Sequence, residues 1–261
     1  YNIMTISIAI TSGKGGVGKT NCAVNMALSL SKIGKKVVLF DTDFGMANAH
    51  ILLGRNPEHN AAEFLQGDVQ IDQILSDGPE GLKFIAGGSG LLEMLNLDNQ
   101  ARYRMLQSLS DLEDQIDYLL VDTPAGASDS TLFFASACAI PVVVLVAEPT
   151  SFLDAYSLIK AAHIDKKIHN FSILVNMADS SESAKKNYDK FFEICRRFLD
   201  VNLHYAGMIP LSNAVRRSIV KRTPIVSAQP GSPEAKAFQA AAMKIIKAPQ
   251  NEQTGIRFFG N

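Results

Sequence analysis

The sequence has few cysteines and no long apolar run, and both absences limit what the protein can be. Three cysteines in 261 residues show no C-x-x-C or other paired spacing, which argues against a disulfide framework or an iron–sulfur carrier and favours a reducing compartment. The most apolar stretch, residues 132–147, is interrupted by Ser136 and Pro141. It is shorter than the roughly 20 residues that a membrane-spanning helix needs. Glycine (18) and proline (10) are too scarce for a collagen-like or disordered chain.

The apolar residues gather in short runs that predict buried strands. Most runs are continuous rather than alternating, which is typical of strands covered on both faces. Seven runs fit this description: residues 5–12, 36–43, 82–87, 118–122, 141–148, 171–177 and 204–209.

Helical patterns lie between these runs and complete an α/β order. They cover residues 20–33, 151–164 (with Ser151 as the expected cap), 181–199 and 233–246. Strands that alternate with helices predict a doubly wound, mostly parallel sheet flanked by helices. We expect one domain over residues 1–248.

Residues 249–261 form a polar tail with a different character. Residues 249–255 are polar and rich in turn formers, and Ile256, Phe258 and Phe259 follow them. Two interpretations stay open. The tail either packs or is disordered, or its apolar residues begin a C-terminal helix that touches a membrane.

A glycine-rich loop follows the first predicted strand and opens the first predicted helix. It matches the phosphate-binding pattern G-x-x-x-x-G-K-[ST] in full, in the structural context that this pattern requires. Glycines let backbone N–H groups turn toward phosphate oxygens, the lysine reaches the β- and γ-phosphates, and the threonine hydroxyl binds Mg²⁺. The predicted nucleotide site therefore contains Gly13, Lys14, Gly15, Gly16, Val17, Gly18, Lys19 and Thr20.

Carboxylates at two strand ends complete a predicted magnesium site. Asp122 ends the fourth apolar run, where a carboxylate beside the phosphate loop holds Mg²⁺ through a water. Asp41 and Asp43 end the second run, and alternation directs both side chains the same way. The alternative for this pair is that it only caps the following turn.

The early lysine of the loop has no obvious task within one subunit. Its spacing resembles the deviant Walker A loop, K-G-G-x-G-K-[ST], of the MinD/ParA ATPases. The resemblance implies a P-loop fold, an ATP-bound homodimer, and a Lys14 that crosses the interface to the partner's nucleotide. It also implies that Asp43 orients the attacking water and that Asp41 supports the metal's shell, with Lys14, Lys19 and Asp43 as the catalytic residues.

The same resemblance implies further contacts outside the loop. Asn21 continues the loop and joins the nucleotide-binding residues, while Asn176 and Pro210 match the family's adenine site. Asp154 matches a position that contacts the partner subunit or its nucleotide. Without the resemblance, Asn176 is equally well read as a turn residue.

Three stretches are most similar to the flagellar-number regulators of this family, the FlhG/FleN group. They are residues 18–21 (GKTN), 41–48 (DTDFGMAN) and 148–160 (EPTSFLDAYSLIK). The resemblance implies a slow, partner-stimulated ATP hydrolase that regulates the number or placement of flagella. Implied partners are flagellar switch components or the signal-recognition-type GTPase FlhF. The implied location is cytoplasmic, with contact to the inner face of the membrane or the cell pole if a C-terminal helix exists.

Other functions stay open at this stage. A ParA-like DNA-partition ATPase would use the same site and bind DNA non-specifically, and a basic cluster at Arg216, Arg217, Lys221 and Arg222 is compatible with phosphate contacts. A MinD-like division-site regulator would need a membrane helix. A nucleotide-binding scaffold without hydrolysis is disfavoured by the intact loop and carboxylates.

Overall fold

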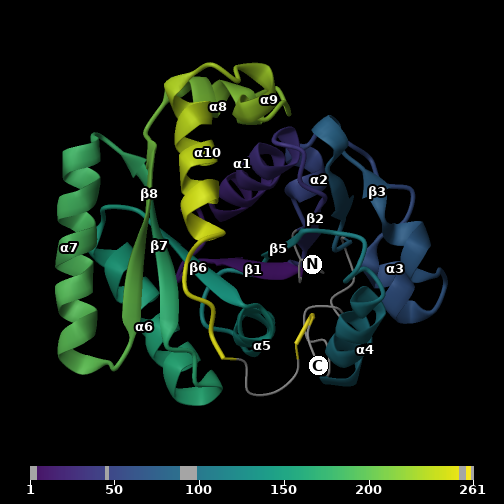
Figure 1. The fold of residues 1–261 in the computed structure, drawn as a ribbon, viewed down its shortest axis with the longest axis horizontal. Helices are drawn as coiled ribbons and strands as arrows, with labels where there is room; N and C mark the ends of the chain where they lie inside the picture. The colour runs from purple at the N-terminus through teal and green to yellow at the C-terminus, as the bar shows by residue number, and fades with distance from the viewer. Residues whose placement is uncertain (1–4, 45–46, 89–98, 253–256, 260–261) are drawn as a thin grey trace.

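The protein forms a three-layer α/β/α domain, seen in a computed structural model that describes residues 5–44, 47–88, 99–252 and 257–259 (Figure 1). A single sheet lies between two layers of helices. In chain order the elements are β1 (Ile6–Thr11), α1 (Lys19–Lys32), β2 (Val37–Asp41), α2 (Ala49–Leu52), α3 (Ala61–Gln66), η1 (Ile71–Ile74), β3 (Ser76–Asp77), η2 (Pro79–Gly81), β4 (Lys83–Ile85), α4 (Asn99–Ser110), β5 (Tyr118–Asp122), α5 (Asp129–Ala137), β6 (Ile140–Leu145), α6 (Pro149–Lys166), β7 (Asn170–Ala178), α7 (Ser181–Phe198), β8 (Asn202–Pro210), α8 (Asn213–Val220), α9 (Ile225–Ala228) and α10 (Pro233–Ile245).

The sheet confirms the predicted doubly wound, mostly parallel class. Its strand order is β3-β4-β2-β5-β1-β6-β7-β8, and β3 pairs antiparallel with β4 while the other described neighbours pair in parallel. The chain starts in the middle of the sheet and winds outward in both directions. The carboxyl ends of β1, β2 and β5 therefore meet at one edge, where ligands bind in sheets of this kind.

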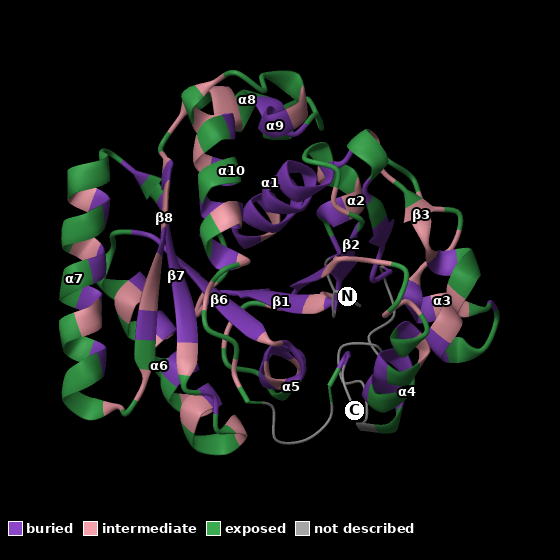
Figure 2. Cartoon of the chain, in the orientation of Figure 1, coloured by how far each residue is buried: buried purple, intermediate pink, exposed green. Residues whose placement is uncertain are grey.

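Alternate residues of the central strands pack into opposite helical layers. In β1, Ile8 and Ile10 pack with α1 and α10, whereas Ala9 belongs to the core on the other face with α4 and α5. A separate cluster joins β6 and β7 to α6 and α7. Because both faces are covered, the strands read as continuous apolar runs. Helix α1 is buried along nearly its whole length (Figure 2), which fixes the loop that precedes it.

Several elements differ from the sequence expectation. Strand β5 has the predicted bounds, but the two-residue β3 and helices α3 and α4 carry too weak an apolar pattern to be expected. Ser151 does not cap α6, because Pro149 starts the helix two residues earlier. The Ser151 hydroxyl accepts a hydrogen bond from the Val146 N–H instead, at 3.1 Å, and so ties the helix to the end of β6.

The described part of the tail packs against the domain. Phe258 is 1% exposed and stacks on Phe134 of α5 with ring centroids 6.3 Å apart, and its N–H donates to the Ala137 carbonyl at 3.1 Å. Phe259 is also buried, whereas Ile256 lies outside the described residues. Phe258 and Phe259 therefore agree with the interpretation in which the tail packs, rather than with the one in which it begins a membrane-touching helix. Across the described ranges, no helix combines the length and apolar character needed to cross a bilayer.

Candidate nucleotide-binding site

The glycine-rich loop connects β1 to α1 at the carboxyl edge of the sheet. Gly16 and Gly18 have positive φ values of 80° and 82°, a conformation that favours glycine. Gly18 is also the residue before α1, and it has no side chain to cap the helix. The first N–H groups of a helix have no partner within it and point toward its N-terminus, so those of α1 are directed toward the loop, as anion binding at a helix N-terminus requires.

Neighbouring elements press closely on two of the loop glycines. A Cβ atom on Gly13 would lie 2.1 Å from the Asp154 backbone carbon of α6, and one on Gly18 would lie 2.4 Å from the Asn176 Nδ2 atom of β7. Asn176 is buried, and its Nδ2 donates to the Val17 carbonyl at 2.7 Å. The loop is therefore held in place by α6 and β7, and only glycine fits at these two contacts.

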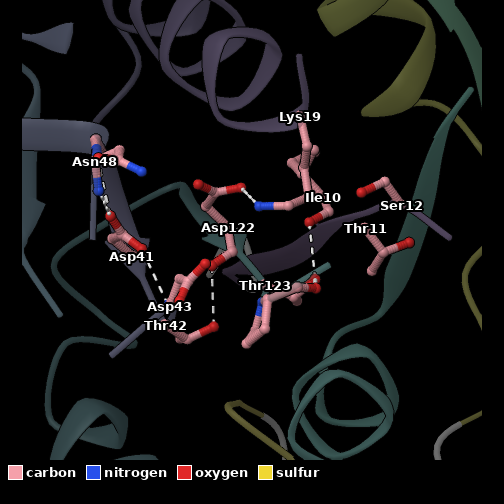
Figure 3. Close-up of polar contacts among 12 residues, drawn as sticks. Ile10, Thr11, Ser12, Lys19, Asp41, Thr42, Asp43, Asn48, Asp122 and Thr123 are labelled. Carbon is pink, nitrogen blue, oxygen red and sulfur yellow. Dashed lines mark hydrogen bonds and ion pairs between the residues drawn. The ribbon is translucent and has the colours of Figure 1, made fainter. Parts of the chain in front are cut away.

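Lys19 lies in the buried centre of the site and pairs with Asp122 (Figure 3). The Lys19 Nζ atom is 2.6 Å from Asp122 Oδ1, and the side chains are 8% and 1% exposed. The second carboxylate oxygen, Asp122 Oδ2, is buried and has no hydrogen-bond partner among the residues that the structure describes. A buried carboxylate oxygen of this kind is a natural cation ligand, because burial without a partner is costly.

Asp41 has a different set of contacts from those expected of a metal ligand. Its Oδ1 accepts from the Asp43 N–H at 3.0 Å, and its Oδ2 accepts from the Asn48 and Ala49 N–H groups at 2.9 and 3.0 Å (Figure 3). Asp41 thus fixes the backbone of Asp43 and the start of α2. Desolvation by burial, with the negative charge of Asp122 beside it in the sheet, raises the pKa of Asp41 to about 7.

The donor set fits Mg²⁺. The free Asp122 oxygen and the hydroxyl of Thr20, at the start of α1, are hard oxygen ligands of the type that Mg²⁺ uses together with phosphate oxygens. Asp41 reaches the same edge, since it lies opposite Asp122 in the β2–β5 register. Both of its oxygens already accept backbone hydrogen bonds, so its place in the metal's shell stays a prediction.

Lys14 lies outside the buried centre, on the side of the loop that faces α6. Its Nζ atom is 2.7 Å from Glu148 Oε2 and 3.1 Å from the Thr150 hydroxyl oxygen. The Lys14 side chain is 29% exposed and that of Glu148 is 60% exposed. Glu148 and Thr150 were part of a subgroup motif in the sequence, but nothing there linked them to Lys14. Both residues follow β6, whose carboxyl end lies at the same edge of the sheet as the loop, and this position could have indicated the contact.

The remaining predicted residues lie beside the loop, at the ends of β7 and β8, or within α1. Asp154 lies beside the loop through its contact with Gly13, and Pro210 ends β8 and pairs with Ala178. Asn176 contacts the loop rather than forming a free turn. Asn21 lies in the first turn of α1 rather than in the loop, and its buried side chain accepts a hydrogen bond from Asn25 Nδ2 at 2.9 Å.

The comparisons with known proteins agree with this geometry. The nucleotide-binding domain model described as CobQ/CobB/MinD/ParA matches residues 8–225, most of the chain. The chain belongs to this family. Its fold and phosphate loop are those of a family of nucleotide-binding ATPases, which confirms the resemblance inferred from the loop.

The relatives of this chain include flagellar proteins. The chain is 39% identical to the antiactivator FleN of Pseudomonas aeruginosa over 97% of this chain and 91% of the relative. It is 32% identical to the flagellum site-determining protein YlxH of Helicobacter pylori over 82% of this chain and 73% of the relative. The solved MinC:MinD cell division complex of Aquifex aeolicus has a chain that matches at 25% identity and a TM-score of 0.74, covering 98% of this chain and all of that one (100%).

Proposed function

We propose that this protein is an ATP-driven dimerising switch ATPase that regulates the number or placement of flagella. The proposal rests on one combination of observations. The phosphate loop carries two lysines, Lys14 and Lys19, and the chain is 39% identical to FleN. The loop geometry supports nucleotide binding, and the relatives support the flagellar role.

In the proposed reaction, ATP and water give ADP and phosphate. Lys19 neutralises charge on the β- and γ-phosphates, and Thr20 and Asp122 would hold Mg²⁺, which would supply further positive charge beside these phosphates. Asp43 orients the attacking water, and Asp41 keeps Asp43 in place through the backbone hydrogen bond at 3.0 Å. Asn176 and Pro210 border the adenine position at the ends of β7 and β8.

Dimerisation provides the switch in this proposal. Lys14 reaches the partner subunit's nucleotide, and Asp154 contacts the partner on the same face, beside the loop. Hydrolysis removes the bridging γ-phosphate, so the subunits separate and present different surfaces to their partners. Turnover is slow for the isolated protein and rises when a flagellar switch component or an FlhF-type GTPase binds.

The rate of ATP hydrolysis and the number of flagella per cell test the proposal together. Asp43→Asn reduces ATP hydrolysis by about 100-fold or more, since a residue that positions or activates the nucleophile contributes on that order. Deleting the gene changes the number or position of flagella seen by electron microscopy, and the parent gene restores it. Normal flagella in the deletion strain would contradict the flagellar role and leave the ATPase assignment intact.

A pull-down distinguishes the flagellar role from DNA partition. ATP-loaded Asp43→Ala protein and ADP-loaded parent are compared on native lysate. Flagellar switch components or an FlhF-type GTPase retained only with ATP support the proposal. Salt-sensitive retention of DNA with a centromere-binding protein, and no flagellar component, would replace it with the partition function.

The cysteines give no support to an iron–sulfur function. Cys22, Cys138 and Cys195 are all free and buried, and burial raises the pKa of each thiol. They lie in α1, just after α5, and in α7. A cluster needs accessible thiolates that converge, and these three belong to separate packed elements.

A further inference from the structure

The lysine assigned to the partner's nucleotide is bound to its own subunit. Lys14 Nζ contacts two acceptors of the same chain, Glu148 Oε2 at 2.7 Å and the Thr150 hydroxyl at 3.1 Å. Both bonds are charge-assisted because the donor is the lysine ammonium, and both lengths fall in the normal range for N–H···O hydrogen bonds. The lysine ammonium has three N–H donors, so these two acceptors use most of its capacity.

The two acceptors are held on a rigid support beside the loop. Glu148 precedes α6, its carbonyl accepts from the Phe152 N–H at 3.1 Å, and its own N–H donates to the Val146 carbonyl at 2.8 Å. The backbone of α6 also presses on Gly13, directly before Lys14. The Glu148 side chain makes no capping hydrogen bond to α6. Its carboxylate is therefore directed to Lys14 rather than to the helix, and loop and acceptors form one unit.

We propose that Glu148, supported by Thr150, is a positioning residue that holds Lys14 within its own subunit and thereby restrains ATP-driven dimerisation. The inference rests on the proposed role of Lys14 at the partner's nucleotide. A lysine bound to Glu148 and Thr150 has to leave them to reach another subunit. The intrasubunit pair and the intersubunit contact thus compete for one amine.

The exposure of the pair sets the size of the effect. Glu148 is 60% exposed and Lys14 29%, so water screens their attraction. Such pairs shift an equilibrium by about two- to fivefold, not by orders of magnitude. The pair is a weak restraint that phosphate, with its higher charge, overcomes. It sets the protein concentration at which dimers form, and does not prevent them.

The test measures dimerisation of the full chain with AMP-PNP and Mg²⁺ by sedimentation velocity over a series of protein concentrations. Glu148→Gln keeps the shape of the side chain and removes its charge. We expect it to form half-maximal dimer at about two- to fivefold lower protein concentration than the parent. The matched control is Glu80→Gln, which removes a glutamate paired with Lys32 at 3.1 Å at the opposite end of α1. It should behave as the parent.

A second variant shows whether the effect acts through Lys14. Lys14→Met alone should dimerise only at higher protein concentration than the parent, and adding Glu148→Gln to it should cause no further shift of the dimerisation midpoint. The contact itself is read by acetic anhydride labelling without nucleotide, followed by peptide mass spectrometry. Lys14 should label about two- to fivefold faster in Glu148→Gln than in the parent, relative to Lys221 as internal reference.

The outcomes separate this inference from the proposed function. A parent that dimerises with AMP-PNP, together with a Glu148→Gln variant whose midpoint is unchanged or higher, overturns the inference alone. An equal shift in the Lys14→Met background overturns it as well, because the effect then bypasses the lysine. A parent that stays monomeric, or a Lys14→Met variant that dimerises as the parent does, contradicts the trans role in the proposed function and the inference with it.

Discussion

The two lysines of the loop each pair with a carboxylate, but one pair is buried and the other is exposed to water. Lys19 pairs with Asp122 in the interior, where both side chains are at most 8% exposed, and Lys14 pairs with Glu148 at the surface, where the carboxylate is 60% exposed. Similar distances, 2.6 and 2.7 Å, therefore have different consequences. The buried pair cannot lose one partner without leaving an uncompensated charge, whereas the exposed pair exchanges easily with water. The first is suited to a fixed site and the second to a changeable contact.

Removing each lysine in turn is the strongest test of this contrast. Lys19→Met leaves Asp122 buried beside Asp41 with no cation, and we expect it to lower the unfolding free energy at neutral pH by about 3–5 kcal/mol. Lys14→Met, the matched change at the surface, costs less than about 1 kcal/mol. Urea unfolding without nucleotide measures both. Equal losses would show that burial does not separate the two pairs.

Asp41, which lies opposite Asp122 of the buried pair, predicts a pH dependence. The folded-state pKa of Asp41, about 7, lies above its ordinary value of 3.8. Between these values the folded chain holds a proton that the unfolded chain has released. The contribution of Asp41 to stability is therefore complete below pH 3.8 and is lost as the pH rises toward 7, by up to about 1.4 kcal/mol per pH unit.

Replacing Asp41 should remove this slope. We expect Asp41→Asn to be less destabilised at pH 7 than at pH 5, relative to the parent, in urea unfolding followed across this range. The amide also loses part of the acceptor capacity that holds Asp43 and α2, which gives a constant offset rather than a slope. Parallel pH profiles for the parent and the variant would contradict the raised pKa.

The contact between the loop and α6 can be broken without touching either lysine. A Cβ at Gly13 would lie 2.1 Å from the Asp154 backbone, while one at Gly15 would meet nothing within 4 Å. We expect Gly13→Ala to cost about 1–3 kcal/mol through overpacking, and Gly15→Ala to cost little. Thermal unfolding measures the difference. Acetic anhydride labelling should show Lys14 freed from Glu148 in Gly13→Ala only, and equal labelling in both variants would disprove the support by α6.

The placement of the groups in the buried half of the site could be predicted because it depends on local patterns. The continuous run ending at Asp122 predicted a strand with the observed bounds and a carboxylate beside the phosphate loop, but the direct pairing of Asp122 with Lys19 was not predicted. The antiparallel addition of β3 was missed, because two residues carry no periodicity. Helix α4 was missed because its polar composition masks its few core residues.

The exposed half needed the three-dimensional structure. Lys14 and Glu148 are 134 positions apart, and their meeting depends on β6 lying beside β1 and on α6 starting at Pro149 rather than at Ser151. The role of Asp41 is similar. Alternation placed its side chain at the right edge, but only the fold shows that three backbone N–H groups occupy its oxygens. A sequence pattern therefore predicts which side chains form a site better than it predicts which groups those side chains contact.

Salt should give the smallest and most selective effect. Raising NaCl from about 0.1 M to about 1 M shortens the Debye length from about 10 Å to about 3 Å, which screens an exposed pair and leaves a buried one nearly unchanged. The difference in Lys14 labelling between the parent and Glu148→Gln should therefore shrink toward zero. The stability loss of Lys19→Met should persist over the same range. If both differences fell together, the two lysines would share one electrostatic environment, and the contrast between a fixed and a changeable contact would fail.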